Sequence, residues 1–191
     1  MKVVCLGDSL TYGYGVPRRD CWVRLAADRT GHQTVNRGIS GDTTGGMLAR
    51  LERDVFLEKP DLLFLMGGAN DIILTGSDLQ ARANMGAMVH QASGRRIRVA
   101  VGLPTPIYPE LIPPAWRALT DFEVLLPVFT AYSNWLMHFC RIFSVKTVNF
   151  STPAFAPPQG KALSLDGLHP NAAGHRLMAE AFCSILPPLR L

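Results

Sequence analysis

Residues 61–68 read Asp-Leu-Leu-Phe-Leu-Met-Gly-Gly and predict the most clearly defined strand of the fold. Every position from 62 to 66 is apolar, so this strand has no polar face to present to water. A parallel strand that is buried on both faces has such a continuous apolar run. The two glycines that follow end the strand and open a turn. We therefore expect a parallel sheet that is covered on both faces.

The rest of the chain alternates between short apolar runs and stretches with helical spacing. The predicted strands are 2–7, 33–37, 61–66, 97–102 and 145–149. The predicted helices are 21–28, 43–55, 78–92, 119–142 and 172–185, and Pro127 is expected to kink or split the fourth of them. This alternation favours an α/β fold with a flavodoxin-like, doubly wound sheet of five parallel strands. A chain of 191 residues suits a single domain over residues 1–191.

The charge of the chain is positive but dispersed. It carries 19 Lys and Arg against 15 Asp and Glu, which gives a net charge of +4. The basic residues form no run of five or more, and they are not interleaved with aromatic residues. A nucleic-acid footprint is clustered, so no nucleic acid is expected as a partner. A small-molecule substrate is expected instead.

The N-terminal apolar run covers only residues 3–6, which is far shorter than the ~7–15 residues of a signal-peptide core. No stretch approaches the ~18 apolar residues that span a bilayer. We therefore expect a cytoplasmic location and no integral membrane segment, with secretion left open; oligomeric state is not indicated. Cys5, Cys21, Cys140 and Cys183 lie far apart without a CxxC pair, so reduced thiols in the core are expected.

Reactive side chains follow four Gly-rich turns near the ends of predicted strands. Because ligands of open α/β sheets bind at the carboxyl ends of the strands, these turns converge on one edge. Taken singly, each is an ordinary turn or helix cap. Together they supply the groups that an acyl-transfer site needs. The turns are Gly7-Asp8-Ser9-Leu10-Thr11, Gly38-Ile39-Ser40-Gly41-Asp42, Gly67-Gly68-Ala69-Asn70-Asp71 and Asp166-Gly167-Leu168-His169-Pro170.

Ser9 is the candidate nucleophile, and a hydroxyl needs a base within hydrogen-bond reach to act as one. His169 is the candidate base, because an imidazole accepts a proton near neutral pH. Asp166 precedes His169 by three residues, so one tight turn can bring its carboxylate to the ring. The backbone N–H groups of Ser9 and Gly41 and the side-chain amide of Asn70 can serve as oxyanion donors.

The four turns resemble, in order, the blocks of the GDSL-type Ser-Gly-Asn-His hydrolases (the SGNH family), which include esterases, lipases and acylhydrolases. The resemblance runs from residue 3 to about residue 175. It implies a three-layer αβα fold, no metal or cofactor, and hydrolysis of esters or thioesters. Carried over, Ser9 is the nucleophile, Asp166 and His169 complete the triad, and Gly41 and Asn70 are oxyanion donors.

Two other classes of protein fit the sequence less well. A flavodoxin-like module that binds a nucleotide or flavin has little support, because GxxxxGK[ST] is absent and the third Gly of GxGxxG is missing after Gly13 and Gly15. The hydrolase scaffold with a G-x-S-x-G elbow is disfavoured, because the second Gly is missing after Ser9.

The substrate is less well indicated. A compact chain favours small or short-acyl esters, with a lysophospholipase, thioesterase or carbohydrate acetylesterase as alternatives in the same family. The Pro-rich stretch 103–116 follows the fourth predicted strand and is expected either to form an acyl pocket or to pack over the sheet edge. The candidate pocket residues are Tyr12, Tyr14, Leu74, Ile107, Tyr108, Leu111, Ile112 and Trp116.

Overall fold

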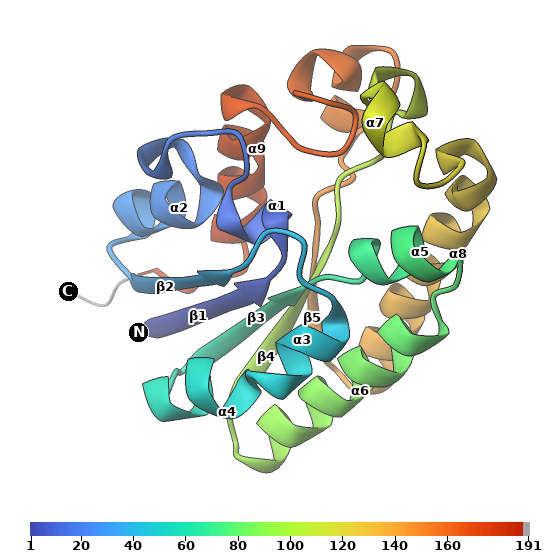
Figure 1. The fold of residues 1–191 in the computed structure, drawn as a ribbon. Helices are drawn as coiled ribbons and strands as arrows, with labels where there is room; N and C mark the ends of the chain where they lie inside the picture. The colour runs from blue at the N-terminus through green and yellow to red at the C-terminus, as the bar shows by residue number, and fades with distance from the viewer. Residues whose placement is uncertain (189–191) are drawn as a thin grey trace.

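The computed structural model describes residues 1–188 and contains a sheet of five parallel strands (Figure 1). The strand order is β2-β1-β3-β4-β5, the order of a flavodoxin-like doubly wound sheet. This confirms the predicted fold class, and every strand boundary lies within one residue of its prediction. The predicted domain extends to residue 191, and residues 189–191 lie outside the described part. The strands are β1 (Lys2–Gly7), β2 (Gln33–Gly38), β3 (Leu62–Met66), β4 (Arg98–Leu103) and β5 (Lys146–Asn149).

Helices cover both faces of the sheet, which makes three layers (Figure 1). Helices α2 and α9 pack on one face, whereas α3, α4, α6 and α8 pack on the other. The helices are α1 (Ser9–Tyr12), α2 (Trp22–Thr30), α3 (Thr44–Ala49), α4 (Leu51–Asp54), α5 (Ala69–Thr75), α6 (Leu79–Gly94), α7 (Pro114–Arg117), α8 (Phe122–Ile142) and α9 (Ala172–Cys183). Short 3-10 turns are η1 (Arg18–Asp20), η2 (Phe56–Glu58), η3 (Pro109–Leu111), η4 (Pro153–Phe155) and η5 (Gln159–Leu163).

The central strands divide their side chains between two cores, because successive residues of a strand point to opposite faces. In β3, Leu63 and Leu65 pack against α6 and α8, while Phe64 and Met66 pack on the side of α2 and α9. Phe64 lies 5.0 Å from the ring of Phe182 and 5.2 Å from that of Trp22, both edge-on. These contacts explain why the whole of 62–66 is apolar.

The predicted helix 43–55 is wrong as a single element, because the backbone breaks at Arg50 between α3 and α4. Pro127 was predicted to kink or split the fourth helix, and it does not split it. Helix α8 runs unbroken over 21 residues, and Pro127 lies only six residues into it. The carbonyl that loses its partner there belongs to Glu123, which is exposed. Neither α1 nor α5 was predicted, since each spans only one or two turns.

Three of the four cysteines are buried free thiols, as expected of core cysteines. They are Cys5, Cys21 and Cys140, while the free thiol of Cys183 is only partly buried. Within residues 1–188, no helix combines the length and the apolar character needed to cross a bilayer.

A buried guanidinium ties together the loops at the carboxyl edge of the sheet. The Arg50 side chain is 8% exposed and donates 2.8 Å to the Asp42 carboxylate and 2.9 Å to that of Asp54. It also donates to the backbone carbonyls of Arg37, at 2.8 Å, and Gly7, at 3.0 Å. Gly7 ends β1 and Arg37 lies near the end of β2, so one side chain reinforces the pairing of these two strand ends.

We expect Arg50→Met to lower the free energy of unfolding by about 3–5 kcal/mol, because it leaves two carboxylates and two carbonyls without their buried partner. Urea denaturation followed by circular dichroism measures this value. Arg24→Met is the matched control, since Arg24 pairs with Asp28 on an exposed helix surface and its loss should change stability little. Equal effects of the two substitutions would contradict the role given to Arg50.

Candidate active site

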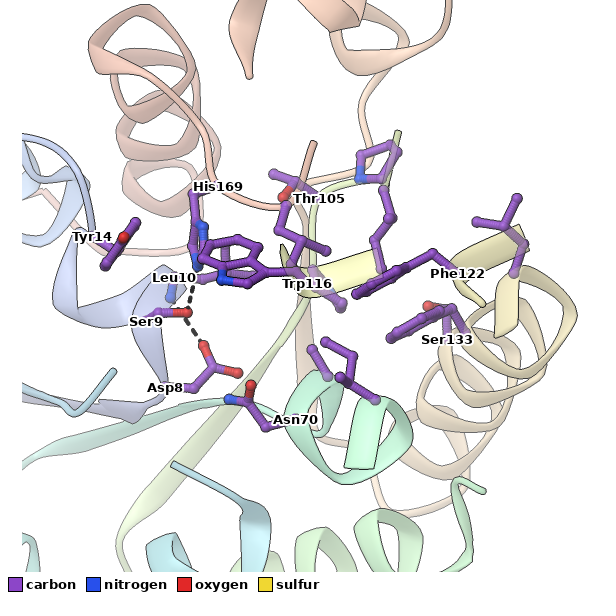
Figure 2. Close-up of a pocket in the computed structure, with 18 of the residues that line it drawn as sticks. Asp8, Ser9, Leu10, Tyr14, Asn70, Thr105, Trp116, Phe122, Ser133 and His169 are labelled. Carbon is purple, nitrogen blue, oxygen red and sulfur yellow. Dashed lines mark hydrogen bonds between the residues drawn. The ribbon is translucent and has the colours of Figure 1, made fainter. Parts of the chain in front are cut away.

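The predicted site residues come together at the carboxyl edge of the sheet, where a cavity opens (Figure 2). Ser9 comes from the end of β1, Gly41 from the loop after β2, and Asn70 from the start of α5 after β3. His169 arrives from the loop between β5 and α9. The four segments are far apart in the sequence, and all four of these residues line the same cavity.

Ser9 is the first residue of α1, and the turn that presents it is tightly packed. Asp8 caps the helix by accepting the backbone N–H of Leu10 at 3.0 Å. A Cβ on Gly7 would lie only 2.2 Å from the Thr11 hydroxyl and 2.4 Å from the carbonyl of Met66. Only glycine fits there, which explains the Gly-Asp-Ser order of the turn.

A chain of hydrogen bonds connects Ser9 to Asp166. The Ser9 Oγ lies 2.8 Å from Nε2 of His169, and Nδ1 of the same ring lies 2.8 Å from Oδ2 of Asp166. An ionised carboxylate only accepts hydrogen bonds, so Nδ1 carries the proton and donates it. Nε2 is then left as the acceptor for the Ser9 hydroxyl. This arrangement lets the imidazole remove a proton from Ser9.

Asp166 is held by its own turn. Its Oδ1 accepts the backbone N–H groups of Leu168, at 3.0 Å, and His169, at 2.8 Å. Burial opposes ionisation of this carboxyl, but the hydrogen bonds from the His169 side chain and backbone, with that from Leu168, outweigh it and lower the pKa of Asp166. The carboxylate therefore stays ionised beside the ring.

Two further titratable groups flank this chain. Burial raises the pKa of the Asp8 carboxyl to about 6. Burial lowers the pKa of His175, on α9, to about 4, and its Nδ1 accepts the backbone N–H of Trp22. His175 is therefore neutral at neutral pH and does not compete with His169 as a base.

Hydrogen-bond donors gather on the other side of Ser9. Gly41 has a φ of +81°, which favours glycine, and no atom lies within 4 Å of the place its Cβ would take. The side-chain amide of Asn70 donates 2.8 Å to the carbonyl of Asp42, which leaves its second N–H uncommitted. Asp71 fixes the start of α5 by accepting both the N–H and the hydroxyl of Thr44. Asp71 therefore holds Asn70 in place beside the loop of Gly41.

The cavity beside Ser9 has a volume of about 560 Å³. Four of the candidate pocket residues line it, namely Tyr14, Leu74, Ile107 and Trp116. Its walls also include apolar residues that were not among the pocket candidates. These are Ile73 on α5, Leu119, and Phe122, Leu126 and Phe129 on α8. Those from residue 119 onward were predicted only as part of a helix, because the inward face of a covering helix has the same pattern whether it meets a sheet or a cavity.

The other candidate pocket residues lie elsewhere. Tyr12 ends α1, is about half exposed and does not line the cavity. Tyr108 is buried, and its hydroxyl donates to the backbone carbonyl of Phe155, so the ring serves packing instead. Leu111 and Ile112 also lie outside the cavity.

The Pro-rich stretch 103–116 both lines the cavity and packs over the edge of the sheet. Ile107 and Trp116 face the cavity, whereas the backbone N–H of Tyr108 donates 2.8 Å to the carbonyl of Gly167. A Cβ on Gly167 would meet the side chain of Ile112 at 2.8 Å, so this stretch packs directly on the turn that carries His169. Within residues 1–188, no three His, Cys, Asp or Glu side chains cluster so that they could hold a metal ion.

The chain is similar to known esterases and lipolytic proteins. The chain is 28% identical to the esterase TesA of Pseudomonas aeruginosa over 98% of its own length and 88% of the relative. It is 28% identical to an acetylxylan esterase of Geobacillus stearothermophilus, over 80% of the chain and 71% of the relative. A solved lipolytic protein of the G-D-S-L family from Veillonella parvula superposes with a TM-score of 0.82 at 26% identity, covering 97% of this chain and 98% of the other.

The family model of the GDSL-like lipases and acylhydrolases matches residues 5–177, a span that contains all four turns. The chain therefore belongs to the GDSL-like lipase/acylhydrolase family and is a carboxylic ester hydrolase.

Proposed function

We propose that the protein is a serine hydrolase that cleaves esters or thioesters of small or short acyl groups through a Ser9-His169-Asp166 triad. The observation that carries the proposal is the 2.8 Å contact between the Ser9 hydroxyl and Nε2 of His169, continued by the 2.8 Å contact from Nδ1 to Asp166. Family membership supports the reaction class. The roles of the residues below are part of the proposal.

In the first step, Ser9 Oγ attacks the acyl carbonyl carbon while His169 Nε2 takes the hydroxyl proton. The carbonyl oxygen becomes an oxyanion. The imidazolium that forms is stabilised by the Asp166 carboxylate, whose lowered pKa keeps it charged. His169 then gives the proton to the departing alcohol or thiol, and an acyl-Ser9 ester remains.

The oxyanion is stabilised by the backbone N–H groups of Ser9 and Gly41 and by the uncommitted N–H of Asn70. Asn70 suits this task because its amide is held by the Asp42 carbonyl at one hydrogen and carries no charge. In the second step, water takes the place of Ser9 as the nucleophile and His169 again removes a proton. The carboxylic acid leaves, and the Ser9 hydroxyl is restored.

The cavity along α5 and α8 is proposed to hold the acyl chain. Its mostly apolar lining suits a hydrocarbon chain longer than an acetyl group, which disfavours the carbohydrate acetylesterase alternative. A lysophospholipase or a thioesterase remains an alternative, since in both reactions the acyl group would be transferred from the alcohol or thiol of the substrate to Ser9 and then to water. A non-catalytic binding module is the competing class.

A small-molecule ester in the cytoplasm is the proposed substrate, with no role for nucleic acid. The cytoplasmic location stays a prediction from the sequence.

Ser9→Ala should lower kcat for a p-nitrophenyl butanoate-type ester by at least about 10³-fold, because no other nucleophile is activated at the site. The circular dichroism spectrum and the melting temperature should stay as in the parent. Ser93→Ala, at an exposed serine near the end of α6, is the matched control and should keep full activity. Unchanged ester hydrolysis by the Ser9 variant would favour the competing class or another nucleophile.

The cavity also predicts a profile of acyl-chain length. Along a series of p-nitrophenyl esters, kcat/KM should rise from acetate to butanoate or hexanoate, as each added methylene is buried against Leu126 and Phe129. It should fall again at palmitate, which exceeds the cavity. Phe129→Trp should narrow the cavity and shift the optimum to shorter chains. A flat profile, or one that is highest at palmitate, would contradict a short-acyl pocket.

A further inference from the structure

The imidazole of His169 is enclosed by two aromatic rings in addition to its hydrogen bonds (Figure 2). The ring of Tyr14 lies with its centroid 4.4 Å from that of the imidazole, at an interplanar angle of 39°. The indole of Trp116 lies 5.7 Å away, edge to face at 78°, and 6.4 Å from Tyr14. His169 is 8% exposed, so the two rings are a large part of its surroundings.

Backbone hydrogen bonds connect the segment of each ring to a segment of the site. The backbone N–H of Tyr14 donates 3.1 Å to the carbonyl of Ser9, so Tyr14 is fixed relative to the nucleophile. Trp116 belongs to α7, at the end of the Pro-rich stretch that hydrogen-bonds to Gly167 through Tyr108. One ring therefore approaches the imidazole from the segment that carries Ser9, and the other from the stretch that is hydrogen-bonded to the turn of His169.

We propose that Tyr14 and Trp116 form an aromatic clamp that positions the His169 imidazole and stabilises its protonated form during the reaction. The proposal rests on the proposed function of His169 as the base. Asp166 and Ser9 each hold one edge of the ring, and neither contact covers its faces. A ring face within ~6 Å of a cation attracts it, and Tyr14 meets this condition when the imidazole takes up the proton.

The charged groups around His169 also affect the stability of its protonated form. The groups that face it are Asp166 in its own turn, Asp8 before α1 and His175 on α9. Asp166 is ionised and favours the imidazolium, whereas burial keeps His175 neutral and raises the pKa of Asp8. Asp166, and Asp8 above its pKa of about 6, are the carboxylates that favour the protonated ring, and the contact with Tyr14 adds to their effect.

The test compares aromatic with aliphatic side chains at the same position. Tyr14→Phe keeps the ring, and Tyr14→Leu keeps most of the apolar cover without a ring. Tyr14→Leu should lower kcat by about 3- to 30-fold with little change in KM, for acetate and hexanoate esters alike. Tyr14→Phe should retain most of the parent kcat. At position 116, the kcat of Trp116→Phe should likewise be higher than that of Trp116→Leu.

The readout that packing alone would not move is the NMR titration of the His169 ring protons. In Tyr14→Leu, its midpoint should fall by about half a pH unit, because the protonated ring loses an attractive face. Phe129→Leu is the matched control, since it removes an aromatic residue of the same cavity that is not among the ring partners of His169. In Phe129→Leu the midpoint of the His169 titration should stay unchanged, whereas the preference for acyl-chain length should change.

An unchanged or raised midpoint in Tyr14→Leu would overturn the clamp, as would equal kcat values for the Phe and Leu variants. The titration does not depend on turnover, so it separates this proposal from the proposed function. If Ser9→Ala kept full activity while the midpoint fell in Tyr14→Leu, the triad would be rejected and the ring contact would stand. If Ser9→Ala lost its activity while the midpoint stayed unchanged in Tyr14→Leu, only the clamp would be rejected.

Discussion

A single buried guanidinium bridges the ends of β1 and β2, the two strands that lead into the segments of Ser9 and Gly41. Arg50 donates to the carbonyl of Gly7, two residues before Ser9, and to the Asp42 carboxylate, next to Gly41. The Asp42 carbonyl then accepts the amide of Asn70. The segments after three strands are thus joined by side-chain hydrogen bonds, in addition to the sheet pairing that reaches Gly7 and Gly38. The parallel sheet sets the register of the strands, and Arg50 adds buried contacts between the segments that follow them.

The chemistry is supported by tight local packing more than by flexible loops. Gly7 lets α1 start directly against β3, and the Asp166 turn closes on its own backbone N–H groups. The Pro-rich stretch then rests on Gly167, which keeps the histidine turn in place and brings Trp116 over the ring. Ser9, His169 and the rings of Tyr14 and Trp116 therefore share one set of supports, and the cavity opens beside them against α8.

Much of this could be predicted from the sequence. Continuous apolar runs such as 62–66 indicate buried parallel strands, and the rule that ligands bind at their carboxyl ends brought Ser9, Gly41, Asn70 and His169 to one edge. The break at Arg50 could not be predicted, because helical spacing continues across it and only the tertiary hydrogen bonds turn its side chain inward. Tyr12 and Tyr108 were placed in the pocket by proximity along the chain, which does not indicate the direction of a side chain. The α8 wall was missed for the same reason, as Phe122 and Phe129 have the spacing of any core helix.

The central claim is that Ser9 carries the acyl group between the two steps. Rapid acid quenching during turnover of p-nitrophenyl hexanoate, followed by peptide mass spectrometry, tests it directly. The account predicts a hexanoyl mass increment on the peptide that contains Ser9, together with a burst of p-nitrophenol equal to the enzyme concentration. Turnover with no acylated peptide, or with the increment on another residue, would contradict it.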